Sequence, residues 1–207
     1  RTDARGVAVV TVNRPQKLNA FSSVLMGEFV GAFDALKADP TIRAVVLTGE
    51  GKAFIAGADI AELATLNEDT ARGFIRRVHQ CCEVIRAFPA PVIARINGYT
   101  LGAGLEGAAA CDLRVAADTA VFGMPEVLLG IPSVVEAAIL PRLMSGGRVR
   151  EVLMLGKNFS AADALAWNFI ERTAAPDRLD AAVSEWIEDI LKCGQNALRL
   201  QKALIRE

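Results

Sequence analysis

A single acid in a stretch of small residues is the strongest candidate for chemistry in this chain. Glu106 lies in the run from Ala90 to Asp112, A-P-V-I-A-R-I-N-G-Y-T-L-G-A-G-L-E-G-A-A-A-C-D, with no Lys or Arg close to it in the sequence. A carboxylate in such surroundings is costly for packing and useful for chemistry. We therefore take Glu106 as the first candidate catalytic residue.

The backbone before Glu106 indicates what this acid could act on. We expect Ala103 in the first turn of a helix, where N–H groups lack intrahelical partners, and Glu106 follows three residues later on the same face. An N–H and a carboxylate one turn apart can address two atoms of one substrate. A thioester oxygen would accept a hydrogen bond from the N–H. The carboxylate would then exchange a proton with water or with the neighbouring carbon. The helix N-terminus favours negative charge on that oxygen.

Two other interpretations of this loop stay open at this point. Gly102-Ala103-Gly104-Leu105-Glu106-Gly107 matches G-x-G-x-x-G, and the next predicted strand ends near Asp118, which is the pattern of a dinucleotide-binding oxidoreductase. Against it, residues 97–101 separate the preceding strand from the first glycine, and Glu106 would repel a pyrophosphate. Alternatively, the glycines serve only close helix–strand packing, and Glu106 is a surface acid.

Strands and helices that alternate along the chain must position these residues. Apolar runs predict strands over residues 7–12, 44–48, 54–55, 91–96, 113–117 and 170–174. Helices are predicted after the N-cap Ser22, from Asp59, over a stretch that carries Phe74 to Phe88 and stops before Pro89, from about Gly102, and over residues 134–144, 148–155, 163–167 and 179–207. Pro125 to Leu129 is predicted as one short turn. This alternation predicts an α/β fold.

Composition limits the function classes. The 207 residues are 52% hydrophobic and 23% charged with a net charge of −1, which predicts a globular protein without nucleic-acid or membrane partners. No apolar run reaches the roughly 18 residues of a membrane span, and no signal peptide is evident, so we expect a cytoplasmic protein or one of an organelle matrix. Four cysteines without a C-x-x-C pair indicate a reducing compartment. The single histidine, His79, argues against a metal site or a Ser-His-Asp triad.

Sequence blocks in a fixed order then carry a resemblance over nearly the whole chain. These blocks are Asn13-Arg14-Pro15, Leu18-Asn19-Ala20, Lys52-Ala53-Phe54-Ile55-Ala56-Gly57-Ala58-Asp59-Ile60, Pro91-Val92-Ile93-Ala94, Asn97-Gly98-Tyr99, Glu106, Ala110-Cys111-Asp112, Phe122-Gly123-Met124-Pro125-Glu126 and Leu129-Gly130-Ile131-Pro132. With them the sequence resembles the crotonase family, the enoyl-CoA hydratases and isomerases. Such a series is more specific than one glycine motif.

The resemblance implies a fold and a reaction. The fold would be a spiral of β-β-α units with a C-terminal helical region that builds trimers, often paired into hexamers. The N–H groups of Ala58 and Ala103 would form an oxyanion hole, and Glu106 and Glu126 would be the catalytic acids. Isomerases of the family commonly lack one of the two acids, so the pair favours hydration of a 2-enoyl-CoA thioester, as in fatty acid metabolism. A 3,2-trans-enoyl-CoA isomerase is the alternative. No cofactor is implied, because coenzyme A is part of the substrate.

The resemblance also implies where the CoA ester lies. Asp59 and Ile60 would follow the pantetheine and adenine, although Asp59 is equally suited to cap a helix. Lys17 is a candidate near the CoA, with an ordinary solvated lysine as the alternative. The candidate substrate-binding residues are Lys17, Ala20, Ala56, Asp59, Ile60, Leu101, Pro125, Leu129 and Gly130.

The sequence departs from the family pattern at two places. Ala103 stands where the hydratases usually have glycine, so its methyl group would narrow the pocket. Ser133-Val134-Val135-Glu136 replaces the usual glycine-rich segment. This replacement leaves the acyl specificity open and introduces a third carboxylate.

We expect a crotonase-like core over residues 1–175 and the start of a helical oligomerisation region over residues 176–207. Val152, Leu153, Trp167 and the apolar residues of the last two helices would supply apolar surface for association. The chain begins at Arg1 without Met and stops inside a helical pattern, so part of each end is expected to be missing.

Overall fold

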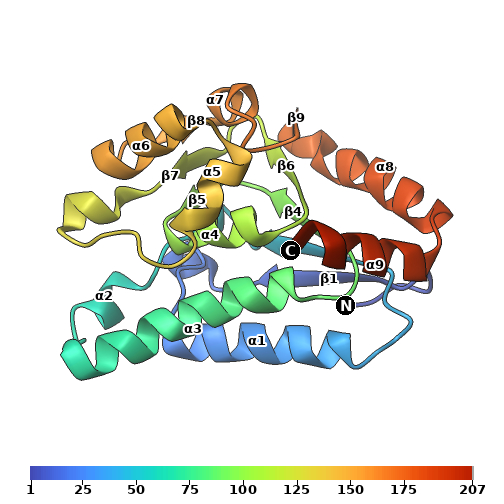
Figure 1. The fold of residues 1–207 in the computed structure, drawn as a ribbon, viewed down its shortest axis with the longest axis horizontal. Coiled ribbons are helices and arrows are strands. Elements are labelled where there is room, and N and C mark those ends of the chain that lie inside the picture. Colours follow the sequence, from blue (N-terminus) through green and yellow to red (C-terminus); the bar gives the residue numbers. More distant parts are fainter. Residues whose placement is uncertain (207) are drawn as a thin grey trace.

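Two sheets of mostly parallel strands form the centre of the computed structural model, which describes residues 1–206 (Figure 1). The five-stranded sheet is parallel throughout and consists, in spatial order, of β1 (Val7–Val12), β2 (Ala44–Gly49), β4 (Val92–Ile96), β6 (Leu113–Ala117) and β9 (Arg172–Ala174). The second sheet consists of β3 (Ala53–Ala56), β5 (Tyr99–Leu101), β7 (Val121–Gly123) and β8 (Phe159–Ser160), of which β8 is antiparallel to β7.

From β2 to β7, consecutive strands alternate between the two sheets, and a helical segment follows each pair. β2 and β3 lead to α2 (Ile60–Leu63) and α3 (Glu68–Arg86), and β4 and β5 lead to α4 (Ala103–Ala110). In the first unit, a parallel bridge between Phe21 and Ala58 takes the place of the second strand before α1 (Ser23–Lys37). The predicted α/β spiral of β-β-α units is therefore confirmed.

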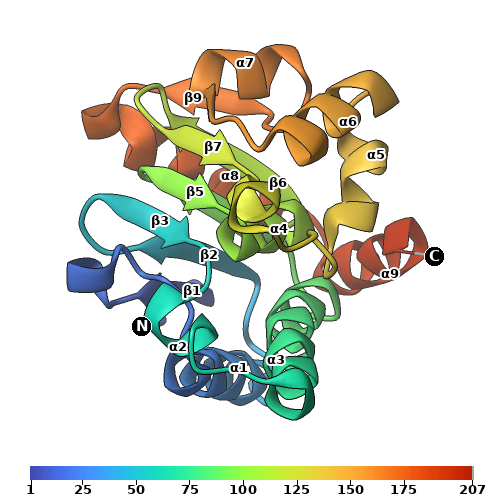
Figure 2. The same cartoon turned by 90° about the vertical axis from the view of Figure 1, so that its left-hand side faces the viewer.

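The helices cover the sheets from several sides. α1 and α3 pack side by side, and α4 packs on α3 and on the second sheet (Figure 2). α8 (Leu179–Lys192) packs on β4, β6 and β9. The remaining helical segments are η1 (Pro15–Lys17), η2 (Pro125–Leu129), η3 (Ala137–Ile139), α5 (Leu140–Leu143), α6 (Gly146–Leu155), α7 (Ala161–Ala166), η4 (Pro176–Arg178) and α9 (Gln195–Arg206).

Most predicted elements lie where the sequence placed them. β1 and β6 agree with the predicted ranges to the residue, and Ser22 caps α1 by accepting a hydrogen bond from the N–H of Leu25. Asp59 caps α2, since its Oδ1 accepts from the N–H of Ala61 at 2.9 Å. Pro125–Leu129 forms the expected short turn as a 3₁₀ helix. Local capping and apolar runs were sufficient signals for these elements.

Two sets of elements differ from the prediction. β5 and β7 have only three residues each and were not predicted as strands, because so short a run shows no periodicity. The helix predicted over residues 134–144 begins only at Ala137, as η3 followed by α5. The last helix is described to Arg206, so its predicted end at Glu207 lies outside the described residues.

The residues expected to supply apolar surface for association differ in their exposure. Val152 is buried in the core, and Trp167 packs on Phe159 with ring centroids 5.0 Å apart. On the last helix, which was also expected to contribute, Leu200, Leu204 and Ile205 are exposed. The oligomeric state and the division at residue 175 stay predictions. No helix within residues 1–206 is both long enough and apolar enough to span a membrane.

Candidate active site

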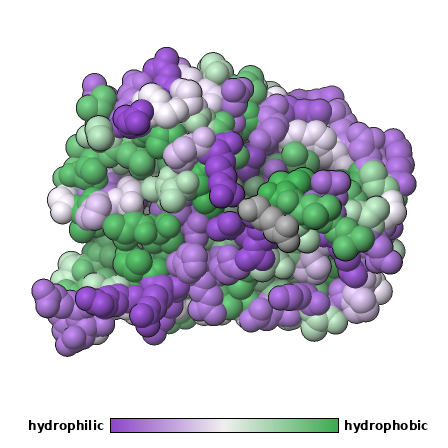
Figure 3. Space-filling view, in the orientation of Figure 1, coloured by the Kyte–Doolittle hydropathy of each residue, from purple (hydrophilic) through white to green (hydrophobic). Residues whose placement is uncertain are grey.

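A cavity of about 460 Å³ opens between α3, the start of α4, and the segment that begins with η2. Apolar side chains form most of its wall, and hydrophobic surface gathers on the same side of the molecule, at the left of Figure 3. Two carboxylates, Glu106 and Glu126, interrupt this apolar lining. The apolar part of the wall consists of Ile60, Leu63, Leu66, Ala71, Phe74, Ile75, Val78, Leu101, Leu129, Ile131, Val134 and Val135 together with small residues and prolines.

α4 holds Glu106 inside the molecule. Every residue of this helix is buried, and Glu106 is only 3% exposed. Gly104 lets the helix approach the second sheet, because a Cβ there would clash with the carbonyl oxygen of Ile55. The interpretation of Glu106 as a surface acid is therefore wrong, although the glycine does serve close packing.

Burial changes the protonation of Glu106. It raises the pKa of this carboxyl to about 7, against a lowering contribution from the backbone N–H of Glu136, which donates to Oε1 at 2.8 Å. The nearby charge of Glu126 raises the pKa further. A carboxyl whose pKa lies near neutral pH can both take and give a proton.

Glu126 enters the cavity from η2, which Pro125 starts and Gly130 ends in a left-handed conformation. Burial also raises the pKa of this carboxyl, while the hydroxyl of Ser133 opposes the rise by donating to Oε2 at 3.2 Å. Gly102 lies against the other oxygen, since a Cβ there would clash with Oε1. The structure therefore brings both predicted acids to one cavity.

Two backbone N–H groups at the cavity are free to donate. Within residues 1–206, neither Ala58 nor Ala103 donates its N–H to a protein acceptor. The bridge at Phe21 uses the carbonyl of Gly57 and the N–H of Asp59, which leaves the N–H of Ala58 pointing the other way. Ala103 is the first residue of α4, where no intrahelical acceptor exists. Both residues line the cavity.

Comparison with known proteins decides which fold and family these features belong to. The family model for enoyl-CoA hydratase/isomerase matches residues 2–207. The chain belongs to the enoyl-CoA hydratase/isomerase family. It is 37% identical to a crotonyl-CoA hydratase of Syntrophomonas wolfei over 97% of this chain and 78% of that protein. It is 36% identical to a short-chain-enoyl-CoA hydratase of Clostridium acetobutylicum over 96% and 77%.

Solved structures place the fold in the same family. An enoyl-CoA hydratase of Mycobacterium smegmatis matches with a TM-score of 0.96 and 34% identity over 99% of this chain and 80% of that chain. One from Bacillus anthracis matches with a TM-score of 0.93 and 35% identity over 97% and 78%. The match to the enoyl-CoA hydratase/isomerase family argues against the dinucleotide-binding alternative. The G-x-G-x-x-G segment instead opens α4, and Glu106 of this helix shares the cavity with Glu126.

The structure places the candidate substrate-binding residues in two groups. Ala56, Ile60, Leu101, Pro125 and Leu129 line the cavity, as do the two acids and the two free N–H groups. The other four lie outside the lining residues: Lys17, Ala20, Asp59 and Gly130. Their contacts to the substrate stay predictions.

The four residues outside the lining have structural surroundings of their own. Lys17 is exposed on η1, and Ala20 is buried. Asp59 pairs with Arg14 at 2.6 Å, and this guanidinium, more than the N–H of Ala61, holds the pKa of Asp59 below its usual range. Gly130 is the left-handed residue that ends η2.

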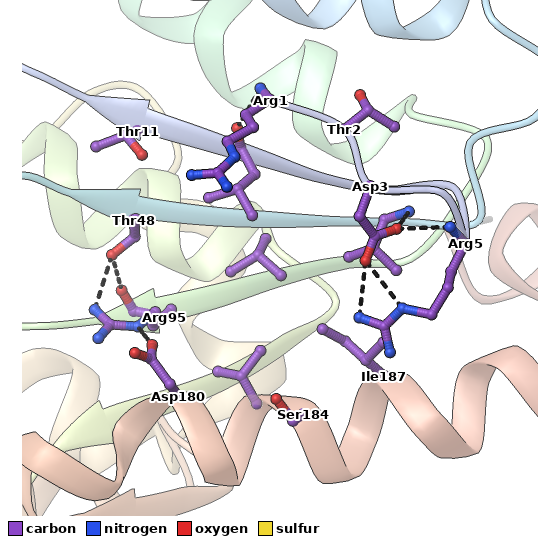
Figure 4. A pocket seen from close by; sticks show the side chains of 14 residues that line it. Arg1, Thr2, Asp3, Arg5, Thr11, Thr48, Arg95, Asp180, Ser184 and Ile187 are labelled. Atoms are coloured by element: carbon purple, nitrogen blue, oxygen red, sulfur yellow. Dashed lines mark hydrogen bonds and ion pairs between the residues drawn. The ribbon is translucent and has the colours of Figure 1, made fainter.

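A second hollow, of about 610 Å³, lies between the five-stranded sheet and α8 (Figure 4). Both carboxylates that line it are paired with arginines. Arg95 donates to Oδ1 of Asp180 at 2.5 Å, and Arg5 donates to Asp3 at 2.8 Å. Throughout residues 1–206, no group of three His, Cys, Asp or Glu side chains could hold a metal ion.

Sequence analysis missed three contributors to the site. They are the hydroxyl of Ser133, the backbone N–H of Glu136, and the apolar face of α3 with Phe74, Ile75 and Val78. The polar residue after Ile131-Pro132 was a signal for the first, since a hydroxyl beside a predicted acid can bind it. The other two depend on which elements meet in space, which the sequence pattern does not show.

Proposed function

We propose that the protein adds water across the 2,3 double bond of a 2-enoyl-CoA thioester. The observation that carries this proposal is the meeting of two glutamates, the buried Glu106 and the partly buried Glu126, with two free N–H groups in one apolar cavity. A crotonyl-CoA hydratase among the relatives is consistent with it. The finer activity and the roles of individual residues are part of the proposal.

The free N–H groups would polarise the substrate. The thioester carbonyl oxygen accepts hydrogen bonds from Ala58 and Ala103, and the conjugated alkene is drawn toward an enolate. The N-terminus of α4 favours the charge that develops on this oxygen. One donor of this kind typically contributes about 2.7–4 kcal/mol of transition-state stabilisation.

The two acids would transfer the protons when water adds. Glu106 takes a proton from water as the hydroxyl bonds to the β-carbon, and Glu126 gives a proton to the α-carbon, so one H and one OH are added. The N–H of Glu136 favours the ionised form of Glu106, which suits it to act as the base. The proton on Glu106 then returns to Glu126, and the pair is ready for the next turnover.

The rest of the cavity would hold the ester. The apolar face of α3 receives the acyl group. The coenzyme A part of the bound ester extends out of the cavity past Ile60 and Leu101, with Lys17 and Asp59 nearer its polar end. Coenzyme A is the substrate's handle, and no further cofactor takes part in this scheme. We also propose a homotrimer or a dimer of trimers, which rests on the resemblance to the family.

A direct assay tests the proposal. Crotonyl-CoA and longer 2-enoyl-CoA thioesters should lose the absorbance of the conjugated double bond, and 3-hydroxyacyl-CoA should appear. Butyryl-CoA, which is saturated, should bind without reaction. Calorimetry should show binding of butyryl-CoA and none of NAD or NADP. Binding of a dinucleotide without any binding of a CoA thioester would reject the proposal.

A 3,2-trans-enoyl-CoA isomerase is the second candidate, because a single glutamate with a pKa of about 7 can shuttle a proton alone. Turnover of 3-enoyl-CoA that exceeds hydration of 2-enoyl-CoA would favour it. In that case Glu126→Gln should cost less than about 10-fold in kcat, whereas Glu106→Gln should abolish most activity.

A further inference from the structure

A third buried acid, Glu136, lies beside the cavity without lining it. Its side chain is 5% exposed, and two side chains of α3 hold its carboxylate. His79 Nδ1 lies 2.6 Å from Oε1, and Arg86 Nη1 lies 3.4 Å from Oε2. His79 and Arg86 are two helical turns apart, so they share a face of α3. These contacts clamp the Glu136 carboxylate to this helix.

The main chain of the same residue reaches the proposed catalytic base. The N–H of Glu136 donates to Oε1 of Glu106 at 2.8 Å, and the bond is buried. Residues 131–136 form no helix or strand, so regular backbone hydrogen bonds do not hold this segment in place. Its position depends on side-chain contacts, and the clamp ties it to α3.

We infer that Glu136 is a positioning residue for Glu106: its clamped carboxylate holds its own backbone N–H against one oxygen of the base. The inference rests on the proposed function, in which Glu106 takes a proton from water. Because Oε1 is occupied by the N–H, Oε2 is the oxygen that remains for water in the cavity. A base accelerates proton transfer only when its free oxygen is aimed at the proton.

The N–H of Glu136 also affects the charge on Glu106. The titratable groups that face Glu106 are Glu126 from η2, the carboxylate of Glu136, and Cys82 from α3. Burial raises the pKa of Cys82 well above its usual range, so this thiol stays neutral. Burial and the two carboxylates raise the pKa of Glu106, whereas the N–H of Glu136 and, to a smaller extent, the N–H of Ala137 lower it. Loss of the N–H would therefore keep Glu106 protonated over more of the neutral range.

Two substitutions at Glu136 separate positioning from other roles. Glu136→Ala removes the clamp, whereas Glu136→Gln keeps the length and the amide atoms that can bond to His79 and Arg86. We expect Glu136→Ala to lower kcat for crotonyl-CoA by ~10- to 100-fold with little change in KM, and to move the acid limb of the kcat profile to higher pH. Glu136→Gln should stay within about 3-fold of wild type.

Stability and a matched variant control this experiment. His79 is 56% and Arg86 28% exposed, so Glu136→Ala leaves no buried unpaired charge, and its thermal unfolding should remain cooperative. Glu185→Ala, a substitution on α8, breaks the 2.5 Å ion pair of Glu185 with Arg172 of β9 and should change neither kcat nor the pH profile. Removing the side chains of His79 and Arg86 together should reproduce the fall in kcat of Glu136→Ala. Combining that double variant with Glu136→Ala should lower kcat little further.

Three results would overturn the inference. They are a wild-type kcat in Glu136→Ala, a Glu136→Gln variant as slow as Glu136→Ala, and a fall in kcat without movement of the acid limb, which indicates packing alone. Glu106→Gln is measured beside them. If Glu106→Gln keeps full activity, the proposed function fails, whereas its inactivity beside an unaffected Glu136→Ala rejects only the role of Glu136.

Discussion

The cavity at Glu106 and the groove between the sheet and α8 differ in how their carboxylates are satisfied. In the groove, Asp180 meets the guanidinium of Arg95, and Asp3 meets that of Arg5 (Figure 4). The N–H of Val7 and then Arg5 hold the pKa of Asp3 below its usual range. In the cavity, Glu106 faces apolar walls and another acid, so its pKa is raised instead.

Whether a carboxylate has a cation as its partner is a better guide to catalysis than the volume of the cavity around it. The groove is the larger of the two, at about 610 Å³ against about 460 Å³. A carboxylate that is paired at the surface stays ionised and exchanges no proton near neutral pH. A buried acid without a cation keeps its proton into the neutral range, which costs stability and serves acid–base catalysis.

Substitution of the two cavity acids should produce the largest effect. Glu106→Gln and Glu126→Gln keep shape and remove proton transfer, so each should lower kcat for crotonyl-CoA at least ~100-fold with little change in ester binding. The double variant should lose much less than the product of the two, because both acids act on one water. Steady-state rates and calorimetry with butyryl-CoA measure the two quantities. Near-wild-type hydration by both single variants would show that neither acid is catalytic.

The pH dependence of stability should set Glu106 apart from the groove. Its folded pKa, about 7, lies above the unfolded value of 4.5, so the stability it contributes is complete below pH 4.5 and is lost as pH rises through 7. In Glu106→Gln this loss is absent. Its free energy of unfolding should therefore gain about 3 kcal/mol relative to wild type between pH 4.5 and 8. Urea unfolding across this range measures the gain, and a constant difference would contradict the raised pKa.

A glycine substitution should disturb the cavity without replacing a titratable group. Gly102 has a φ of +50° and lies against Oε1 of Glu126, so the methyl group of Gly102→Ala would displace that carboxylate. We expect kcat to fall ~10- to 100-fold. Gly147→Ala in α6, where a Cβ meets nothing within 4 Å, is the matched control and should keep full activity. An active Gly102→Ala variant would mean that Glu126 tolerates displacement.

Much of this fold could be predicted from local signals. β6 was predicted to the residue because its apolar run is bounded clearly, and Ser22 marked the start of α1 because its side chain caps the helix. β5 and β7 could not be predicted, because their partners lie in a second sheet that forms only when the chain spirals. The sequence predicts a helix over residues 134–144, yet Val134 and Val135 line the cavity without helical structure, and the N–H of Glu136 donates to Glu106.

The candidate site was predictable only in part. Glu106 stood out because an acid among glycines and alanines has no local partner, and Glu126 came from the resemblance to a family. The role of Ser133 and the contact between Glu136 and Glu106 depend on a segment without regular structure. No periodicity specifies which way such a segment turns its N–H groups.

The smallest effect is expected in the groove, at Asp180. Its side chain is 83% exposed, and an exposed ion pair contributes little because water screens it and both side chains lose freedom. Asp180→Asn should therefore change Tm by less than about 3 °C and leave kcat and its pH profile unchanged. Arg95 keeps its contact with Thr48 at 3.3 Å, so the groove does not collapse. Thermal melts and the crotonyl-CoA assay at pH 6 and pH 8 measure this. A loss of activity comparable to that of Glu106→Gln would break the comparison, because it would show that a fully paired surface carboxylate also takes part in the reaction.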